Sequence, residues 1–348
     1  MQILDNPHRS RGIDHPDLAA MPWPSADAAA PRALLARCPA HAPTPLAEAR
    51  ALAAEAGIAA LHVKDERGRM GLGSFKALGA ASVIAVDAER GRARGATYVT
   101  ASAGNHGLSV AAGARAFGAR ARIFLSRAVP SAFADRLAAE GAEVVRAGAD
   151  YAESMQEAED AARRDGHVLL SDSSWPGYAD LPHLLMQGYL VLTDEAAAQL
   201  PAPPTHVFVQ AGVGGLAAAV AAHARALWGD TPRIVVVEPE AAPALAASIA
   251  AGAPVTAPGP VSAMGRLDCK TPSLVALKGL ARDACAFATI TEDEAATAVA
   301  RAAAHGLAST PSGAAGLAGL LAAGADLRDR LGLDASSRVL AFLTERPE

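Results

Sequence analysis

Short runs rich in β-branched residues alternate along this chain with alanine-rich segments of helical length, and this alternation constrains the fold most. Each run is short enough for one buried strand, and a helix between two strands returns the chain to the same edge of a sheet. The sequence therefore predicts an α/β fold with doubly wound parallel sheets. The predicted strands are "ATYVT" (96–100), "ARIFL" (121–125), "EVV" (143–145), "HVFVQAG" (206–212), "RIVVVEP" (233–239) and "RVLAFLT" (338–344).

The chain is long enough for two such units, because its 348 residues exceed the usual size of one domain. The strand–turn–helix pattern that begins at residue 96 ends before "HVFVQAG", as if one small α/β domain were inserted into a larger one. We assign residues 86–185 to the inserted domain and residues 1–85 and 186–348 to the larger, discontinuous domain. This division predicts a cleft between the two.

Charge and cysteine content exclude several classes of partner. The chain carries 36 acidic and 31 basic residues, a formal net charge of −5, without a basic block, which argues against nucleic acid and anionic membranes. The uncharged run from Gly306 to Ala325 contains five glycines and a proline and is less apolar than a membrane-spanning helix. Three scattered cysteines and a charged N-terminus without a signal peptide predict a cytoplasmic protein without a metal site.

Two small-residue turns follow predicted strands and open helices. In "QAGVGGLAAAV", Gly212, Gly214 and Gly215 can bring backbone N–H groups close to an anion, although a tight turn without a ligand has the same appearance. The spacing is neither GxGxxG nor that of a P-loop. In "TASAGNHGLSV", Ser102 to His106 form a second turn that offers donors for a carboxylate, but an ordinary helix start looks similar.

Lys76 in "GLGSFKALGA" is the only charged residue between Gly71 and Ala85. A lone lysine is usually a solvated surface charge. Its uncharged surroundings here predict instead a partly buried amine with a lowered pKa, able to attack an aldehyde. A phosphate loop and a reactive lysine together are the two features that pyridoxal phosphate requires.

Four motifs in this order resemble the fold-type-II pyridoxal-phosphate enzymes, the group of threonine dehydratase, serine racemase and tryptophan synthase β. They are "SFKALGA", "TASAGNHG", "QAGVGGLAAAV" and "TPSGAAGL". The block "SDSSWPGYADLPHLLMQGYLVLTDEA" (171–196) is similar to the corresponding segment of diaminopropionate ammonia-lyase, and "LTER" is similar to its "STEG". The resemblance runs from about residue 44 to the C-terminus and implies the tryptophan synthase β-like fold, with pyridoxal 5′-phosphate in the cleft between two domains.

The resemblance also implies roles for individual residues. Lys76, after Phe75, is then the lysine that forms the Schiff base, and Asp172 is an acid that acts on the substrate, although it also suits a helix N-cap. Asn105 contacts the pyridine 3′-oxygen and Thr344 the pyridine nitrogen. The loop that holds the phosphate comprises Gly212, Val213, Gly214, Gly215 and Leu216, and the residues around the substrate carboxylate are Ser102, Gly104 and His106.

By the same resemblance the chain is a carbon–nitrogen lyase of amino-acid catabolism. The implied reaction is the α,β-elimination of L-2,3-diaminopropionate to pyruvate and ammonia, in a cytoplasmic homodimer with a small amino acid as its partner. The alternative with the same cofactor is a dehydratase of serine, threonine or 3-hydroxyaspartate. A pseudoenzyme and a nucleotide-binding module are options from other classes, but the retained lysine and asparagine, and the lack of a nucleotide fingerprint, argue against them.

Several positions depart from the family pattern. Ala103 stands where relatives carry an acidic or hydroxyl group on the face opposite the lysine, which predicts selectivity for L-substrates. Arg266 and Lys270 add charge to a segment that is neutral in the family, and either of them binds an acidic substrate side chain if it faces the cleft. Pro311 replaces a glutamate, and Cys269 and Cys285 stand where the family has cysteines able to pair, although we expect free thiols here.

Overall fold

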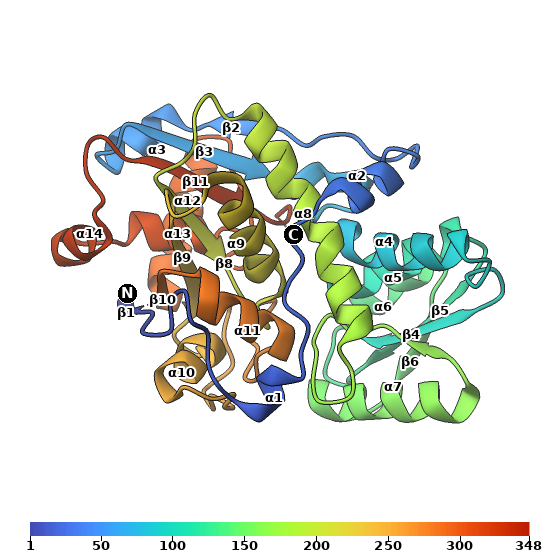
Figure 1. Ribbon diagram of the computed structural model, residues 1–348. Coiled ribbons are helices and arrows are strands. Elements are labelled where there is room, and N and C mark those ends of the chain that lie inside the picture. The colour runs from blue at the N-terminus through green and yellow to red at the C-terminus, as the bar shows by residue number, and fades with distance from the viewer. Residues whose placement is uncertain (348) are drawn as a thin grey trace.

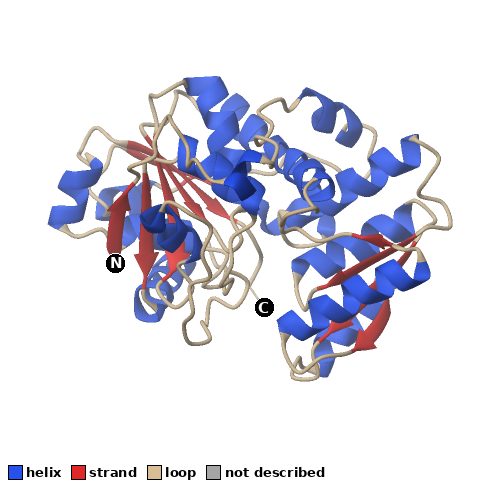
Figure 2. Ribbon diagram, turned by 60° about the horizontal axis from the view of Figure 1, so that its bottom comes forward, coloured by secondary structure: helices blue, strands red, loops and turns tan. Residues whose placement is uncertain are grey.

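A computed structural model describes residues 1–347, and their strands form two separate sheets (Figures 1 and 2). The strand order of the larger sheet is β1-β10-β9-β8-β11-β3-β2. Its strands are β1 (Gln2–Asp5), β2 (Leu46–Glu48), β3 (Ala60–Asp65), β8 (His206–Gln210), β9 (Arg233–Pro239), β10 (Ala286–Ile290) and β11 (Arg338–Leu343). The smaller sheet has the order β6-β5-β4-β7, with β4 (Thr97–Ala101), β5 (Arg120–Leu125), β6 (Glu143–Arg146) and β7 (Val168–Leu169).

The predicted α/β class with parallel sheets is confirmed, with one correction at the edges of the larger sheet. All six predicted strands are present, and every strand pair in the smaller sheet is parallel. In the larger sheet, β1 pairs with β10 and β2 pairs with β3 in the antiparallel sense. Both are edge strands, and an edge strand can join in either direction because only one of its sides is paired.

Alternating side chains of the larger sheet enter two hydrophobic cores. In β8, Val207 and Val209 belong to one core and Phe208 to the other, as the two-residue period of a strand requires. Helices that contribute to the first core are α8 (Asp180–Gln199), α9 (Gly215–Trp228) and α11 (Leu274–Asp283). Helices that contribute to the second are α3 (Arg50–Glu55), α12 (Glu292–Ala304), α13 (Ala315–Leu321) and α14 (Ala325–Leu331).

The smaller sheet is also covered on both faces. Val99 of β4 packs against α7 (Tyr151–Asp165), and Tyr98 faces the core that contains α5 (Asn105–Ala116). Helix α4 (Lys76–Glu89) packs on α5 and on α8, and α8 in turn packs on α9, so α8 runs between the two sheets (Figure 1). The remaining helices are α1 (Pro16–Ala19), α2 (Ala29–Leu35), α6 (Ser131–Ala139), α10 (Ala244–Ala251) and the 3-10 helix η1 (Glu66–Gly71).

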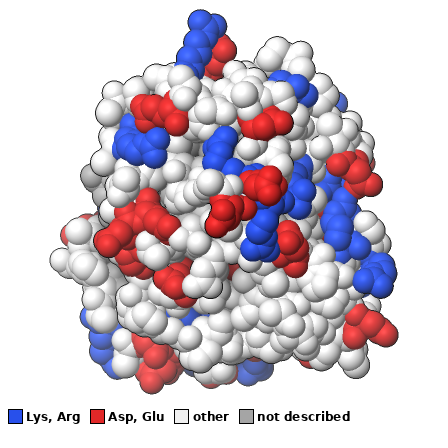
Figure 3. Space-filling view, turned by 90° about the vertical axis from the view of Figure 1, so that its left-hand side faces the viewer, with Lys and Arg blue, Asp and Glu red and all other residues white. Residues whose placement is uncertain are grey.

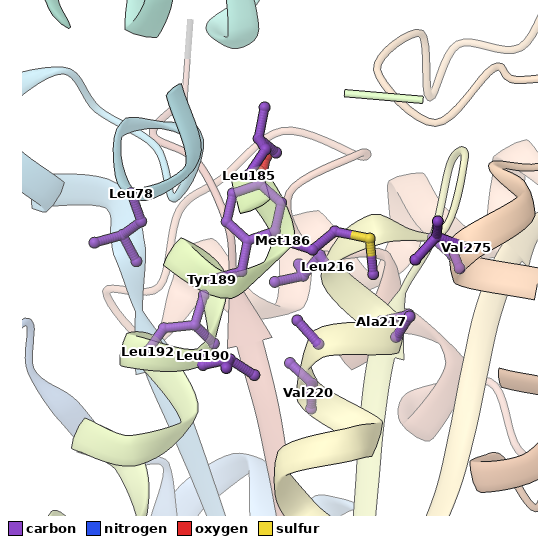
Figure 4. Packing of buried hydrophobic residues seen from close by; sticks show 14 of the residues in the cluster. Leu78, Leu185, Met186, Tyr189, Leu190, Leu192, Leu216, Ala217, Val220 and Val275 are labelled. Atoms are coloured by element: carbon purple, nitrogen blue, oxygen red, sulfur yellow. The ribbon is translucent and has the colours of Figure 1, made fainter. Parts of the chain in front are cut away.

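Side chains of α8 interlock with those of α4 and α9 in one cluster (Figure 4). Met186 and Tyr189 of α8 lie between Leu78 of α4 and Leu216 of α9. The α4–α8 contact depends on small residues, because a Cβ on Gly188 would stand 2.3 Å from the carbonyl oxygen of Leu78. The helix that carries Lys76 is therefore held at a fixed distance from α8.

The distribution of charge on the surface agrees with the composition, which argues against nucleic acid and anionic membranes as partners. On the face shown in Figure 3, acidic and basic side chains lie interspersed among uncharged ones, without a broad basic patch. Within residues 1–347, every helix is too short or too polar to cross a bilayer.

Candidate active site

The candidate site lies where loops leave the carboxyl ends of parallel strands. The segments that follow β3, β4, β8 and β11 carry Lys76, the 102–106 turn, the glycine loop and Thr344, respectively. Ligands of open α/β sheets bind at such edges, since strand ends and helix N-termini meet there. The segments predicted as separate motifs thus follow strands of both sheets and converge on one region.

Backbone and hydroxyl contacts position Lys76, the first residue of α4. The N–H of Phe75 donates to the Thr344 carbonyl at 3.0 Å, and the Ser109 hydroxyl of α5 donates to the Lys76 carbonyl at 2.7 Å. The Lys76 Nζ lies 5.3 Å from the centre of the Phe75 ring and 5.9 Å from that of Tyr189. An apolar wall thus lines one side of the amine.

Lys76 forms an ion pair with Asp172, through Nζ and Oδ2. Burial by itself lowers the pKa of Lys76, but the Asp172 carboxylate outweighs it and holds the pKa above the ordinary lysine value. Burial raises the pKa of Asp172, yet the Lys76 ammonium holds it well below its usual range. The predicted lowered pKa of Lys76 is therefore wrong for the chain without its cofactor, because sequence could not show a carboxylate 96 residues away beside the amine.

Asp172 does not cap a helix. It lies in a bend before α8, which begins only at Asp180. Of its two sequence interpretations, the structure excludes the helix N-cap, and the role as an acid that acts on the substrate stays a prediction.

The glycine loop has the geometry of an anion cradle. Gly214 adopts φ +101° as the N-cap of α9, a conformation that favours glycine, and no side chain caps this helix. Within residues 1–347, the N–H groups of Gly212, Gly214, Gly215 and Leu216 donate to no other residue. A Cβ on Gly212 would stand 3.0 Å from the Cys269 sulfur, so the loop has no room for a side chain there. These donors fit a phosphate at a helix N-terminus.

The 102–106 turn is a tightly bonded helix start. The Ser102 hydroxyl accepts hydrogen bonds from the N–H of Gly104 at 3.2 Å and of Gly107 at 3.1 Å. His106 is buried and donates from Nε2 to the Leu170 carbonyl at 2.8 Å, which joins this turn to the segment of Asp172. Burial lowers the pKa of His106, and its ring is therefore a neutral support of the turn.

Thr344 and Glu345 continue β11 into the site. The Gln210 amide donates to the Thr344 hydroxyl at 3.1 Å, and that hydroxyl donates to the Gly313 carbonyl at a long 3.5 Å, so its proton can turn to a nearer acceptor. Glu345 is 5% exposed and accepts hydrogen bonds from Asn105 and from the Thr310 hydroxyl. Its carboxylate also pairs with the Arg266 guanidinium at 3.1 Å, so one buried acid joins the elements around the site.

The two extra charges of the 263–273 segment separate in space. Arg266 lines a cavity beside Asn105 and Glu345. Lys270 instead donates to the carbonyls of Ala241 at 2.8 Å and Pro260 at 2.7 Å and pairs with Asp268. Of Arg266 and Lys270, only Arg266 therefore lies where it can contact a ligand.

Other positions that depart from the family pattern have plain environments. The residues on either side of Pro311, Thr310 and Ser312, hydrogen-bond to the Glu345 carboxylate and the Arg266 N–H. Cys269 and Cys285 are free thiols, as expected. Residues 1–347 contain no group of three or more histidine, cysteine or acidic side chains arranged to hold a metal.

Sequence reasoning missed two residues of this site. Tyr189 and Glu345 belong to the motifs that resemble the family, but their sequence context predicts no role for either. Tyr189 is buried against Phe75, with ring centres 4.9 Å apart. A glutamate two residues after the largely buried strand β11 is a signal that could have drawn attention to Glu345, since buried carboxylates need partners.

The residues present fit pyridoxal phosphate. The loop offers unpartnered donors for a phosphate, Lys76 provides the amine for an aldehyde, and Thr344 and Asn105 offer polar groups between them. Fold and site together define an α/β enzyme of the class that binds a phosphorylated aldehyde cofactor. The pyridoxal-phosphate dependent enzyme family matches residues 38–345, and the chain belongs to this family.

The chain is similar to several members of this family with named activities. Diaminopropionate ammonia-lyase of Salmonella typhimurium is 30% identical, over 89% of this chain and 86% of its own length. A serine dehydratase-like protein of Mus musculus is 33% identical, over 76% of each chain. The crystal structure of Escherichia coli diaminopropionate ammonia-lyase with an aminoacrylate–cofactor intermediate superposes with a TM-score of 0.88 at 28% identity, covering 99% of this chain and 93% of that one.

Proposed function

We propose that this chain is a carbon–nitrogen lyase that eliminates ammonia from L-2,3-diaminopropionate to give pyruvate and a second ammonia. The observation that carries the proposal is the Lys76–Asp172 ion pair beside an open phosphate loop, which combines a base and an acid at one cofactor site. The similarity to diaminopropionate ammonia-lyase over most of both chains supports this choice of substrate.

The bound cofactor supplies an aldehyde for the substrate amine and a ring that accepts the electron pair of the α-carbon. The chain supplies the proton transfers. Lys76 Nζ, once it has given up its proton, takes the proton from the α-carbon. The phosphate loop and the Phe75–Tyr189 wall hold the reacting atoms in place and exclude water from the amine. Thr344 donates to a ring nitrogen without protonating it.

Asp172 gives the pair its second function. An amine leaves as ammonia only when it is protonated, and a carboxyl group beside Lys76 can receive the lysine proton and pass it to the leaving nitrogen. Hydrolysis of the released imine then yields pyruvate. The Ala103 methyl group cannot exchange a proton on the opposite face, and we therefore propose selectivity for the L-substrate.

The same site supports a second candidate function, the dehydration of a β-hydroxy amino acid. Serine dehydratase-like relatives at 33% identity favour it. A hydroxyl group also needs a proton to leave, so the Lys76–Asp172 pair serves either reaction. Turnover of L-serine at a rate comparable to that of diaminopropionate would favour the dehydratase.

We extend the proposal to the organisation of the protein. We propose that the site residues have the roles that the resemblance implies, and that the protein is a cytoplasmic homodimer. We also propose that residues 1–85 and 186–348 form one large domain, into which residues 86–185 are inserted as a smaller domain. The smaller sheet, which spans residues 97–169, is consistent with the inserted part.

An absorbance titration tests the proposal. The purified chain with pyridoxal phosphate is expected to show a visible band that shifts on addition of L-2,3-diaminopropionate, while pyruvate forms in the same cuvette. Lys76→Ala should lose the band, and Lys278→Ala, a change at a partly buried lysine beside Trp23, should keep it. A shifted band without pyruvate would reject this substrate, and no band at all would reject the cofactor assignment.

A further inference from the structure

A cavity of about 370 Å³ opens beside the proposed cofactor site, and arginines dominate its lining. Arg136 of α6, Arg266 and Arg346 line it together with Asn105 and Glu345. Among the described residues of its lining, three guanidinium groups accompany one carboxylate. We call this cavity the arginine pocket.

The carboxylate that lines the pocket within residues 1–347 already has partners. Glu345 is 5% exposed, pairs with Arg266 at 3.1 Å and accepts hydrogen bonds from Asn105 and Thr310. Within residues 1–347, neither Arg136 nor Arg346 forms an ion pair with an acidic side chain. The backbone of Arg346 is fixed, because its N–H donates to the Gly73 carbonyl at 2.9 Å. Arg136 and Arg346 therefore line the cavity without an acidic partner among the described residues.

The pocket adjoins the turn proposed to hold the substrate. The Arg266 Nε would lie 3.7 Å from a Cβ on Gly104, and its backbone N–H donates to Ser312 at 3.2 Å, which fixes where the guanidinium begins. Asn105, which lines the pocket, is the residue next to Gly104. A substrate held by its α-carboxylate at this turn can therefore extend a second group toward the arginines.

We propose that the arginine pocket binds a carboxylate on the β-carbon of the substrate. The substrates it fits are 3-substituted L-aspartates, which carry an amino or hydroxyl leaving group and a carboxylate on the same carbon. Guanidinium groups recognise carboxylates by charge-assisted, often bidentate hydrogen bonds. This inference rests on the elimination reaction proposed above and extends it to an acidic substrate class.

The reaction balances without any other reactant than water. The α-carbon loses its proton, and the electron pair of the broken C–H bond forms the double bond to the β-carbon. The leaving group departs with the electron pair of its bond to the β-carbon and takes up a proton. The resulting enamine becomes an imine, water adds to it, and ammonia leaves. 3-Hydroxyaspartate thus gives oxaloacetate and one ammonia, and 2,3-diaminosuccinate gives oxaloacetate and two.

Binding of unreactive analogues tests the pocket separately from catalysis. L-Aspartate and L-alanine lack a leaving group, and each should shift the visible band of the cofactor-loaded protein when it binds. We expect L-aspartate to bind at least about tenfold more tightly than L-alanine, because only L-aspartate offers the second carboxylate. We also expect 3-hydroxyaspartate to exceed L-serine in kcat/KM by a similar factor, with oxaloacetate measured through NADH and malate dehydrogenase.

Variants identify the arginines responsible. The double variant Arg136→Gln/Arg346→Gln avoids the buried Glu345 pair and should remove most of the preference for L-aspartate while L-alanine binds as before. Arg266→Gln should have the same effect if it folds, and Lys270→Gln, on the same segment but turned away from the pocket, should keep the preference. Equal binding of the two analogues in the unmodified protein, with pyruvate still formed from diaminopropionate, would overturn the pocket assignment alone. Absence of the visible band would overturn the proposed function as well.

Discussion

Replacing Asp172 by asparagine should make Lys76 more reactive toward an aldehyde. In the chain without cofactor the carboxylate pairs with the Lys76 ammonium and holds its pKa high. Two unit charges about 4 Å apart at an effective dielectric constant of about 20 interact by about 4 kcal/mol. The two side chains are 22% and 18% exposed, and solvent screening reduces this to about 2 kcal/mol.

A loss of about 2 kcal/mol corresponds to an approximately 30-fold larger fraction of neutral amine at a pH below the pKa. The measurement is the rate at which the visible band appears when pyridoxal phosphate is mixed with cofactor-free protein at pH 7 to 9. Asp172→Asn should combine with the cofactor about 30-fold faster than the unmodified protein. Asp180→Asn changes an exposed carboxylate at the start of α8 and should combine with the cofactor at the same rate as the unmodified protein.

The reasoning fails if Asp172→Asn, with an unchanged circular dichroism spectrum, combines with pyridoxal phosphate at the unmodified rate or more slowly. That result would mean that the carboxylate helps the amine to lose its proton more than it stabilises the charged form.

Three further predictions concern packing, a buried acid and stereochemistry. Gly188→Ala should lower the free energy of unfolding by about 2 kcal/mol in urea denaturation, because its methyl group meets the backbone of Leu78, whereas Gly68→Ala, with open space around it, should change it little. Burial raises the pKa of Glu238 to about 8, so protonation stabilises the fold at low pH and this contribution is lost as pH rises from about 5 to 8. Glutamine mimics the protonated side chain, so the unmodified protein should lose stability relative to Glu238→Gln as pH rises over that range, and a gain of stability relative to Glu238→Gln would contradict the assignment. Ala103→Asp should add turnover of the D-isomer of diaminopropionate, measured as pyruvate, while the unmodified protein should use only the L-isomer.

Much of the fold was predictable because its signals are local. Strands with both faces buried read as continuous apolar runs, as in "RIVVVEP", and all six predicted strands lie where the pattern placed them. The missed strands are shorter or less rich in β-branched residues; β2 has three residues and β7 two. Pairing at a sheet edge stabilises them, and no local pattern reports that.

The sequence by itself determined the class of the protein and the ingredients of its site. Strand and helix periodicity predicted an α/β fold, and a lysine with a glycine loop, together with the resemblance of four ordered motifs to fold-type-II enzymes, indicated the cofactor. These signals depend on residues close together in the chain.

Only the tertiary structure decided how these ingredients act on one another. It brought Asp172 to Lys76 across 96 positions, which reversed the expected direction of the lysine pKa. It also turned Arg266 into a cavity and Lys270 away from it, although the two stand four residues apart. Electrostatic interactions and burial depend on distances in space, and the packing of α8 between the two sheets sets those distances.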